Sequence, residues 1–201
     1  MNEKMTTQLN MFKFSRNEQL WQKLETCFDK AYPRENIKMI CRLQDKHKLA
    51  GFSKLATPIY NFPGCVEDQY SSFIISKQPE LAQNPILAVN ELDSYSGKLA
   101  MDKWLQRKNI PYQELKVTGA HIESVRFVLE SKAHIAAIDC VSWAYIQAEI
   151  PEAKNLHIID QTELVAGHPI VIQNKPNDLS KEIKVESDLL EKLGIKSFKF
   201  H

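Results

Sequence analysis

Glycine is scarce in this sequence, with six residues among 201, and none of them stands in a nucleotide-binding pattern. The G-x-G-x-x-G fingerprint, the Walker loop and the H-E-x-x-H helix of zinc proteases are all absent. An excess of one charge is missing too, because 26 Lys and Arg stand against 25 Asp and Glu. A nucleotide-dependent enzyme and a zinc protease are therefore unsupported, and nonspecific binding to nucleic acid is not expected.

Long apolar runs are also missing. No run approaches the 18 or so residues that a membrane-spanning helix needs, and the N-terminus shows no apolar core of a signal peptide. We therefore expect no membrane insertion. As written, the chain is expected to be cytoplasmic, and it would be periplasmic if the true start lies upstream.

Cysteine occurs four times, at Cys27, Cys41, Cys65 and Cys140, with no C-x-x-C pair and no histidine at zinc-finger spacing. Neither a metal nor a cofactor is therefore expected. We interpret these residues as reduced thiols, and two disulfides are the alternative.

The composition, with 43% hydrophobic and 25% charged residues, is typical of a globular chain. An amphipathic helix is predicted over 17–31, and strands over 7–12, 37–43 and 70–76. Near the C-terminus, a strand is predicted over 169–173 and a helix over 180–193.

Residues 86–164 alternate strands with helices, which predicts parallel strands joined by right-handed crossovers. The strands are predicted over 86–90, 112–117, 134–138 and 156–160, and the helices over 96–107, 121–131 and 140–148. The fold class is therefore α/β. We expect a second lobe of residues 86–164 and a discontinuous first lobe of 1–85 plus 165–201, with one continuous sheet as the alternative.

Polar residues follow three successive strands of this region. The turns run over 91–97, 118–124 and 139–143. Because parallel strands end at the same edge of a sheet, the turns are expected together, where ligands of α/β proteins bind. Hydroxyl groups, glycine and the open N–H groups of helix N-termini suit an oxyanion. Taken singly, Ser94 or Ser96 and Asp139 are also open to interpretation as helix caps, Thr118-Gly119 as an ordinary turn, and His121 as a satisfied surface or core histidine.

His121 is expected at the start of a helix, where a proton on its ring opposes the helix dipole by about 0.3–1 kcal/mol. An anion ~4 Å away would offset this by up to about 4 kcal/mol at an effective dielectric of ~20. We therefore expect a neutral ring in the empty site and a cationic ring once an anion binds.

The same turns hold the residue types of a hydrolase triad, namely Ser94 or Ser96 with His121 and Asp139. A nucleophile elbow, G-x-S-x-G, would need glycine at position 92 for Ser94, and Leu92 stands there. We therefore expect a non-catalytic site. An enzyme acting on a phosphorylated or acyl substrate is the alternative from another class.

Three stretches together resemble the phosphate, phosphite and phosphonate substrate-binding proteins of ABC transporters. They are AVNELDSYSG (88–97), VTGAHIESVRFVLESKAHIAAIDCVSW (117–143) and, less specifically, ATPIYNFPGCVEDQYSSFII (56–75). The resemblance implies a two-lobed type 2 periplasmic-binding-protein fold with a ligand cleft between the lobes. It implies a small tetrahedral oxyanion as ligand and, if the chain is exported, an ABC transporter permease as partner.

The resemblance also assigns roles to single residues. Ser94, Tyr95, Ser96 and Gly97 match the turn that donates to the oxyanion, and His121 matches the binding histidine.

Three further residues complete the implied site. Ser124 lies one helical turn after the histidine, and Asp139 matches an acid that accepts a ligand proton or pairs with a ligand amine. Tyr70 resembles an aromatic residue that the first lobe contributes, and its alternative interpretation is a tyrosine at a strand end.

The sequence departs from the family in two ways. Residues 44–60 run on as if a strand and turn of the first lobe were missing, and Met11-Phe12 stand where these proteins tend to have tyrosine. The second departure from the family is that the sequence shows no export signal. A degenerate relative kept for a protein contact is therefore a further alternative.

Overall fold

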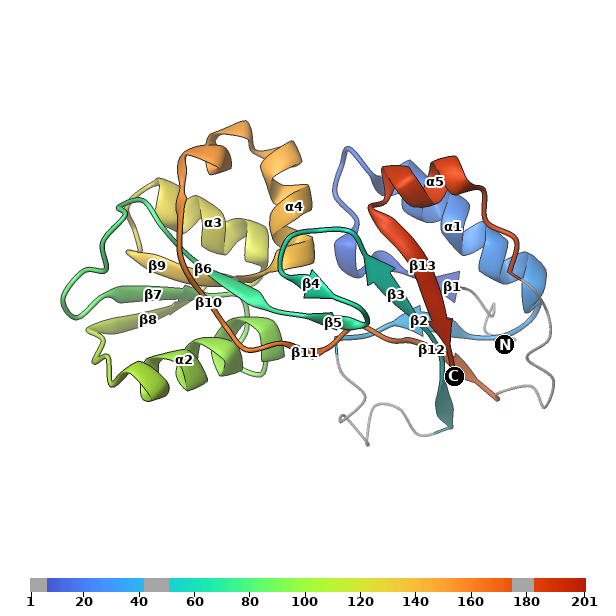
Figure 1. The fold of residues 1–201 in the computed structure, drawn as a ribbon, viewed down its shortest axis with the longest axis horizontal. Coiled ribbons are helices and arrows are strands. Elements are labelled where there is room, and N and C mark those ends of the chain that lie inside the picture. The colour runs from blue at the N-terminus through green and yellow to red at the C-terminus, as the bar shows by residue number, and fades with distance from the viewer. Residues whose placement is uncertain (1–6, 42–50, 175–182) are drawn as a thin grey trace, which may run out of the picture. The chain divides into compact units, whose positions relative to one another are not determined.

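The chain folds into two compact units (Figure 1), and the computed structural model describes residues 7–41, 51–174 and 183–201. Unit 1 comprises Met1–Asn61 and Ala166–His201, and unit 2 comprises Phe62–Val165. The sequence placed the boundary near residue 86, so residues 62–85 lie in the other unit from the one expected. Each unit has a five-stranded sheet of its own, and the alternative of one continuous sheet is wrong.

Unit 1 is built on a sheet with strand order β1-β2-β12-β3-β13. The strands are β1 Thr7–Gln8, β2 Ile37–Met39, β3 Phe52–Tyr60, β12 Ile170–Gln173 and β13 Ile195–Phe200, and the helices are α1 Glu18–Ala31 and α5 Ser187–Lys192. The predicted strand over 7–12 ends early, because Asn10–Phe12 forms a 3-10 turn. Residues 42–43 and 180–182 of two other predicted elements lie outside the described residues.

The apolar stripe of α1 forms the core of unit 1, as its spacing predicts. Trp21, Leu24 and Phe28 recur on one helix face and are fully buried. The Phe12 ring packs against Trp21 and, edge-on, against His168, with ring centroids 6.2 and 4.8 Å apart. All of these side chains belong to unit 1, so the unit has an apolar core of its own.

Unit 2 contains a sheet with strand order β10-β6-β9-β7-β8. Its strands are β6 Ser72–Ser76, β7 Ile86–Val89, β8 Glu114–Val117, β9 Ile135–Asp139 and β10 His157–Gln161, and its helices are α2 Ala100–Lys108, α3 His121–Leu129 and α4 Cys140–Glu149. Its smaller elements are the β4 (Cys65–Val66) and β5 (Gln69–Tyr70) hairpin, the π-helical turn Tyr95–Leu99 and the 3-10 turn Pro151–Asn155. The short strand β11 (Val165–Ala166) contains the last residue of unit 2 and the next residue, which belongs to unit 1.

The sheet of unit 2 is mixed. β7 pairs in parallel with both β8 and β9, as the alternation of strands and helices predicts. β6 pairs antiparallel with β9, and β10 pairs antiparallel with β6. The expectation that the 156–160 strand continues the parallel series is therefore wrong, because this strand returns along β6 at the sheet edge.

Helices cover both faces of this sheet (Figure 1). On one face, α2 contributes Met101, Trp104 and Leu105 to a core shared with Leu87 and Val89. On the other face lie α3 and α4. This three-layer arrangement fixes the three parallel strands, and hence the turns that follow them, at one edge of the sheet.

Candidate functional site

The three polar turns of unit 2 meet at the carboxyl ends of β7, β9 and β8. The chain runs from β7 to β8 on one side and then crosses back to β9 on the other. α2, which follows β7, and α3, which follows β8, therefore leave toward opposite faces of the sheet. Ligands of open α/β sheets bind at such a reversal of strand order.

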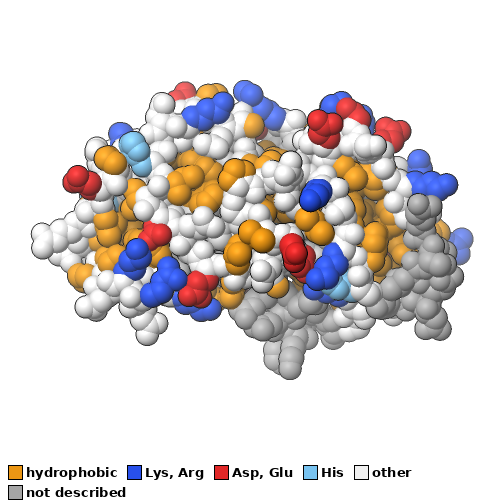
Figure 2. Space-filling view, viewed as in Figure 1, with side chains coloured by type: hydrophobic (Ala, Val, Ile, Leu, Met, Phe, Trp, Pro, Cys, Tyr) orange, Lys and Arg blue, Asp and Glu red, His pale blue; other side chains and the backbone are white. Residues whose placement is uncertain are grey.

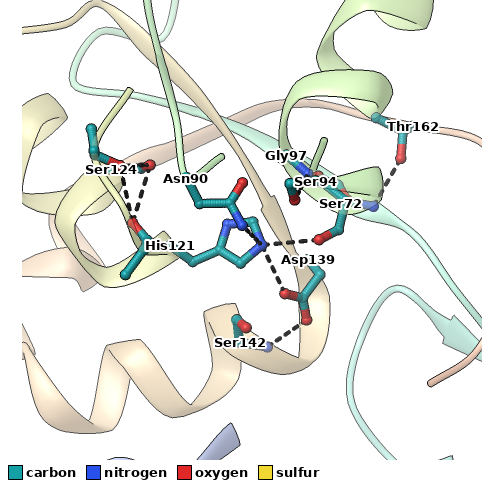
Figure 3. Close-up of polar contacts among 12 residues, drawn as sticks. Ser72, Asn90, Ser94, Gly97, His121, Ser124, Asp139, Ser142 and Thr162 are labelled. Carbon is teal, nitrogen blue, oxygen red and sulfur yellow. Dashed lines mark hydrogen bonds and ion pairs between the residues drawn. The ribbon is translucent and has the colours of Figure 1, made fainter. Parts of the chain in front are cut away.

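The His121 ring is the centre of this edge (Figure 3). Its Nε2 lies 3.0 Å from the Ser96 hydroxyl oxygen and 3.2 Å from Oδ2 of Asp139. A serine of the first turn and an aspartate of the third thus converge on one ring nitrogen of the histidine in the second. The structure brings together three of the residues that the sequence singled out.

The contacts of Nε2 decide which ring nitrogen carries the proton. A bare Nε2 would set its lone pair against the lone pairs of the Asp139 carboxylate at 3.2 Å. We therefore assign the hydrogen to Nε2, which donates to Asp139 and Ser96. The Ser96 O–H is then left to point at an incoming acceptor.

The same geometry does not form a hydrolase triad. In a triad the serine contacts one ring nitrogen and the acid contacts the other. Here Ser96 and Asp139 both contact Nε2, and Nδ1 is buried without a hydrogen-bond partner among the described residues. An acid in this position cannot hold His121 as a base for the serine.

Burial lowers the pKa of His121 below its usual value, and the nearby carboxylates of Asp139 and Glu91 oppose this shift. The ring is therefore neutral near pH 7, as expected from the sequence, although burial rather than the helix dipole is the main cause. A bound anion would favour the protonated ring, because it adds negative charge beside a site from which water is largely excluded.

The turn after β7 is held by its own side chains. The Ser94 hydroxyl accepts a hydrogen bond of 3.1 Å from the Gly97 amide and so caps the π-helical turn. Ser72, at the start of β6, donates to the Ser96 carbonyl at 2.8 Å. Of the two predicted serines, Ser94 therefore shapes the turn, and Ser96 reaches the histidine.

Asn90 is a site residue that the sequence reading missed. Its side-chain nitrogen lies 3.5 Å from His121 Nε2, and its Oδ1 is buried without a hydrogen-bond partner among the described residues. A Cβ built on Gly97 would fall 1.9 Å from that oxygen. An amide directly after a parallel strand, where ligands bind, is the signal that could have identified Asn90.

Asp139 has two roles because its two oxygens differ. Oδ1 accepts a 2.7 Å hydrogen bond from the Ser142 amide and caps α4, whereas Oδ2 faces His121. Ser124 is directed elsewhere: it is fully buried, and its hydroxyl lies 2.7 Å from that of Thr118 and donates to the Ala120 carbonyl. In this structure Ser124 holds the second turn together.

The two tyrosines predicted for the site lie apart from the histidine contacts. Tyr70, in β5, is 1% exposed and belongs to unit 2 rather than to the first lobe. Tyr95 lies under the Lys103 ammonium, 5.4 Å from the ring centroid. With Ser96 and Trp104, Tyr95 borders a small hollow between α2 and residues 162–165.

Backbone donors at this edge suit an anion better than a cation. The first-turn amides of α3 receive no side-chain cap, since residue 120 is alanine. Among the described residues, no Lys or Arg makes a hydrogen bond or ion pair with Ser96, His121 or Asp139. A small anion would therefore be held by dipoles, a hydroxyl and the histidine rather than by fixed cations.

The described residues seen in Figure 2 carry charges of both signs. On the face drawn in Figure 2, Lys and Arg side chains lie interspersed with Asp and Glu. Among the described residues, no group of three or more His, Cys, Asp or Glu could hold a metal ion. In the same part of the chain, no helix has the length and apolar character to cross a membrane.

No protein-family model matches this sequence, and no curated protein does. Solved structures match in fold. The binding-protein component of an ABC phosphonate transporter from Pseudomonas aeruginosa matches with a TM-score of 0.73 and 13% identity, covering 98% of this chain and 81% of that one.

Two further solved structures show the same architecture. PhnD1 from Prochlorococcus marinus, in complex with methylphosphonate, matches with a TM-score of 0.58 and 12% identity over 96% of this chain and 83% of its own. The GluR0 ligand-binding core from Nostoc punctiforme, in complex with L-glutamate, matches with a TM-score of 0.53 and 12% identity, covering 93% and 90%. The predicted two-lobed α/β fold is thereby confirmed.

Proposed function

We propose that this chain, which has the fold of type 2 periplasmic binding proteins, is a non-catalytic binding protein for a small tetrahedral oxyanion of the phosphate, phosphite or phosphonate type. The observation that carries the proposal is the convergence of Ser96 and Asp139 on Nε2 of His121, at the edge where three parallel strands end. Solved structures of the same fold support it, among them a component of an ABC phosphonate transporter and a protein in complex with methylphosphonate.

The charge of the site explains how an anion binds beside a carboxylate. With a neutral ring, the His121 and Asp139 pair carries one negative charge and repels an anion. A proton on His121 makes the pair neutral overall. We therefore propose that the anion binds together with one proton, which is taken up from solvent or delivered as the ligand's own hydrogen.

Asp139 gives the site a preference among oxyanions. Hydrogenphosphate and the O-protonated forms of phosphite and phosphonates carry an O–H hydrogen that Oδ2 can accept, and sulfate carries none near neutral pH. The amide that Asp139 caps holds its carboxylate in place for this contact. A ligand amine, as in aminoethylphosphonate, is the second partner that a carboxylate here accepts.

Thermal unfolding in the presence of single anions tests the proposal. A bound oxyanion stabilises the folded chain by about 2.7 kcal/mol at a hundredfold excess over its dissociation constant. We expect shifts with phosphate, phosphite, methylphosphonate or aminoethylphosphonate that exceed those with sulfate and chloride at equal ionic strength. Equal shifts with every anion, or none with any of them, would contradict the proposal.

The fold also suggests a protein partner for this chain. Type 2 binding proteins that match this chain include a component of an ABC transporter. We propose a transporter permease as the partner if the chain is exported. Co-purification with the permease encoded nearest to it, with and without phosphonate, would test this partnership.

A further inference from the structure

Two cysteines far apart in the sequence meet in unit 2, where Cys140 directly follows Asp139. Cys65 in β4 and Cys140 at the start of α4 are 75 residues apart, and their sulfur atoms lie 3.2 Å from each other. Both thiols are free. A disulfide bond is about 2.05 Å long, so the two sulfurs need to close by only ~1.2 Å.

The surrounding structure holds this pair in register. The Ser71 amide and hydroxyl both donate to the Gly64 carbonyl at 3.0 Å, and the Cys140 amide donates to the Ser71 carbonyl at 3.0 Å. These bonds bring the start of the β4–β5 hairpin onto the first residue of α4. A Cβ on Gly64 would fall 2.8 Å from the Cys140 Cβ, so glycine at position 64 allows this approach.

We propose that Cys65 and Cys140 are a redox-active pair that forms a reversible disulfide by exchange with a low-molecular-weight disulfide such as oxidised glutathione. Cys65 is half-buried and is reached first, whereas Cys140 is 1% exposed. Cys65 is therefore the attacking thiol and Cys140 the resolving one. The inference does not depend on what the anion site binds.

The exchange balances in two steps. The Cys65 thiolate attacks one sulfur of the glutathione disulfide, forms a mixed disulfide and releases one glutathione thiolate. Cys140 then loses its proton to solvent and attacks the Cys65 sulfur, which releases the second glutathione thiolate. The two cysteines are oxidised, and one glutathione disulfide is reduced to two thiols.

The pKa values of the two thiols are shifted in the opposite directions that this mechanism requires. A hydrogen bond from Cys140 lowers the pKa of Cys65 against the opposing effects of burial and of Asp139. The same bond, with burial, raises the pKa of Cys140. The thiolate thus forms on the more exposed sulfur, while the buried one keeps its proton until the mixed disulfide removes its partner's charge.

The test uses the full chain equilibrated in buffers of graded oxidised-to-reduced glutathione ratio, trapped with a thiol-blocking reagent. We expect two of the four thiols to be lost, a product lighter by two hydrogens and a cross-linked peptide containing Cys65 and Cys140. Dithiothreitol should reverse the change. Persistence of all four thiols, a stable glutathione adduct on Cys65, or a cross-link through Cys27 or Cys41 would overturn the proposal.

Matched variants isolate the pair. The C27S/C41S variant keeps both proposed partners and should lose its two remaining thiols at the same ratio as the parent, with a higher melting temperature when oxidised. The C65S variant changes the more exposed of the two cysteines, so we expect it to disturb folding less than a change at the buried Cys140. It should melt at the same temperature in oxidising and reducing buffer, and a redox-dependent shift that survives in C65S would overturn the assignment.

Discussion

The side-chain oxygen of Asn90 stands where a β-carbon of residue 97 would be, 1.9 Å from its ideal position. Glycine is required at position 97 because a side chain there would clash with Asn90, and not because of its φ angle. The turn after β7 packs against Asn90, the residue that follows the strand. Any side chain on residue 97 has to displace Asn90, which itself lies beside His121.

The first prediction concerns this contact. Gly97→Ala should lower the free energy of unfolding by about 1–3 kcal/mol, as overpacking does in other cores. Denaturant unfolding measures the loss. If the clash with Asn90 is the cause, the Asn90→Ala/Gly97→Ala double variant should lose less than the sum of the two single variants. Strictly additive losses would count against it.

The second prediction separates two neighbouring serines. Ser94→Ala removes the cap on Gly97 and should cost about 1 kcal/mol of stability. Ser96→Ala removes the hydroxyl beside His121 and should weaken anion binding by about 1.5–3 kcal/mol, the contribution of a hydrogen bond to a charged group. Calorimetric titration with the anion that stabilises the parent protein measures the second loss.

Each serine variant serves as the control for the other. Changing both residues should abolish detectable binding. If Ser96→Ala binds as the parent does, the anion does not contact this turn, and the proposed site has to be placed elsewhere.

The third prediction is a pH dependence that His121 produces. Burial depresses its pKa in the folded chain, so the unfolded chain binds the proton more tightly. Stability should therefore be constant above the unfolded pKa of ~6.5 and fall below it, by about 1.4 kcal/mol per pH unit until the folded pKa is reached. The measurement is denaturant unfolding from pH 5 to 8.

His121→Gln is the comparison, because the variant loses the titrating group and should show a flatter profile over the same range. Identical profiles would mean that other groups set the pH dependence. With an anion that brings no hydrogen of its own, titrations in buffers of different ionisation enthalpy should reveal uptake of one proton by the parent protein and none by the variant.

The fourth prediction tests Asp139 without removing its cap. Asparagine caps helices about as well as aspartate, so Asp139→Asn should leave α4 in place. It removes the carboxylate that faces His121, and the preference for hydrogen-bearing oxyanions over sulfate should shrink or vanish. An unchanged ratio of phosphate to sulfate affinity would exclude the acid from ligand selection.

Much of unit 2 could be predicted from the sequence, because its period changes cleanly from strand to helix between residues 86 and 149. The three polar turns were placed at one sheet edge for the same reason. β3 was missed because Lys54, Thr57 and Pro58 interrupt its alternation, although the strand is nine residues long and lies between β12 and β13. Residues 52–60 of the stretch in which the sequence suggested a missing strand therefore form a strand, and residues 44–50 lie outside the described residues.

Side-chain roles at the site were harder to predict than the place of the site. Nothing local tells which of Ser94 and Ser96 caps the turn, because the π-helical winding of residues 95–99 decides it. Ser124 follows the expected spacing, yet a hydroxyl contact with Thr118 holds it in the turn. The sequence analysis assigned residues 156–160 to the parallel series, whereas β10 is antiparallel to β6. The direction of a strand depends on the strand with which it pairs, and local periodicity does not identify that partner.

The order of strands in unit 1 sets an order of events in synthesis. β12 lies between β2 and β3, and β13 lies beyond β3, yet both come from the last part of the chain. On a ribosome, residues 62–165 emerge as one uninterrupted stretch and can form their sheet while β2 and β3 still lack the strand that joins them. Unit 1 is thus the first to be synthesised in part and the last to complete its sheet. Its strand edges stay unpaired until the C-terminal segment is synthesised and pairs with them.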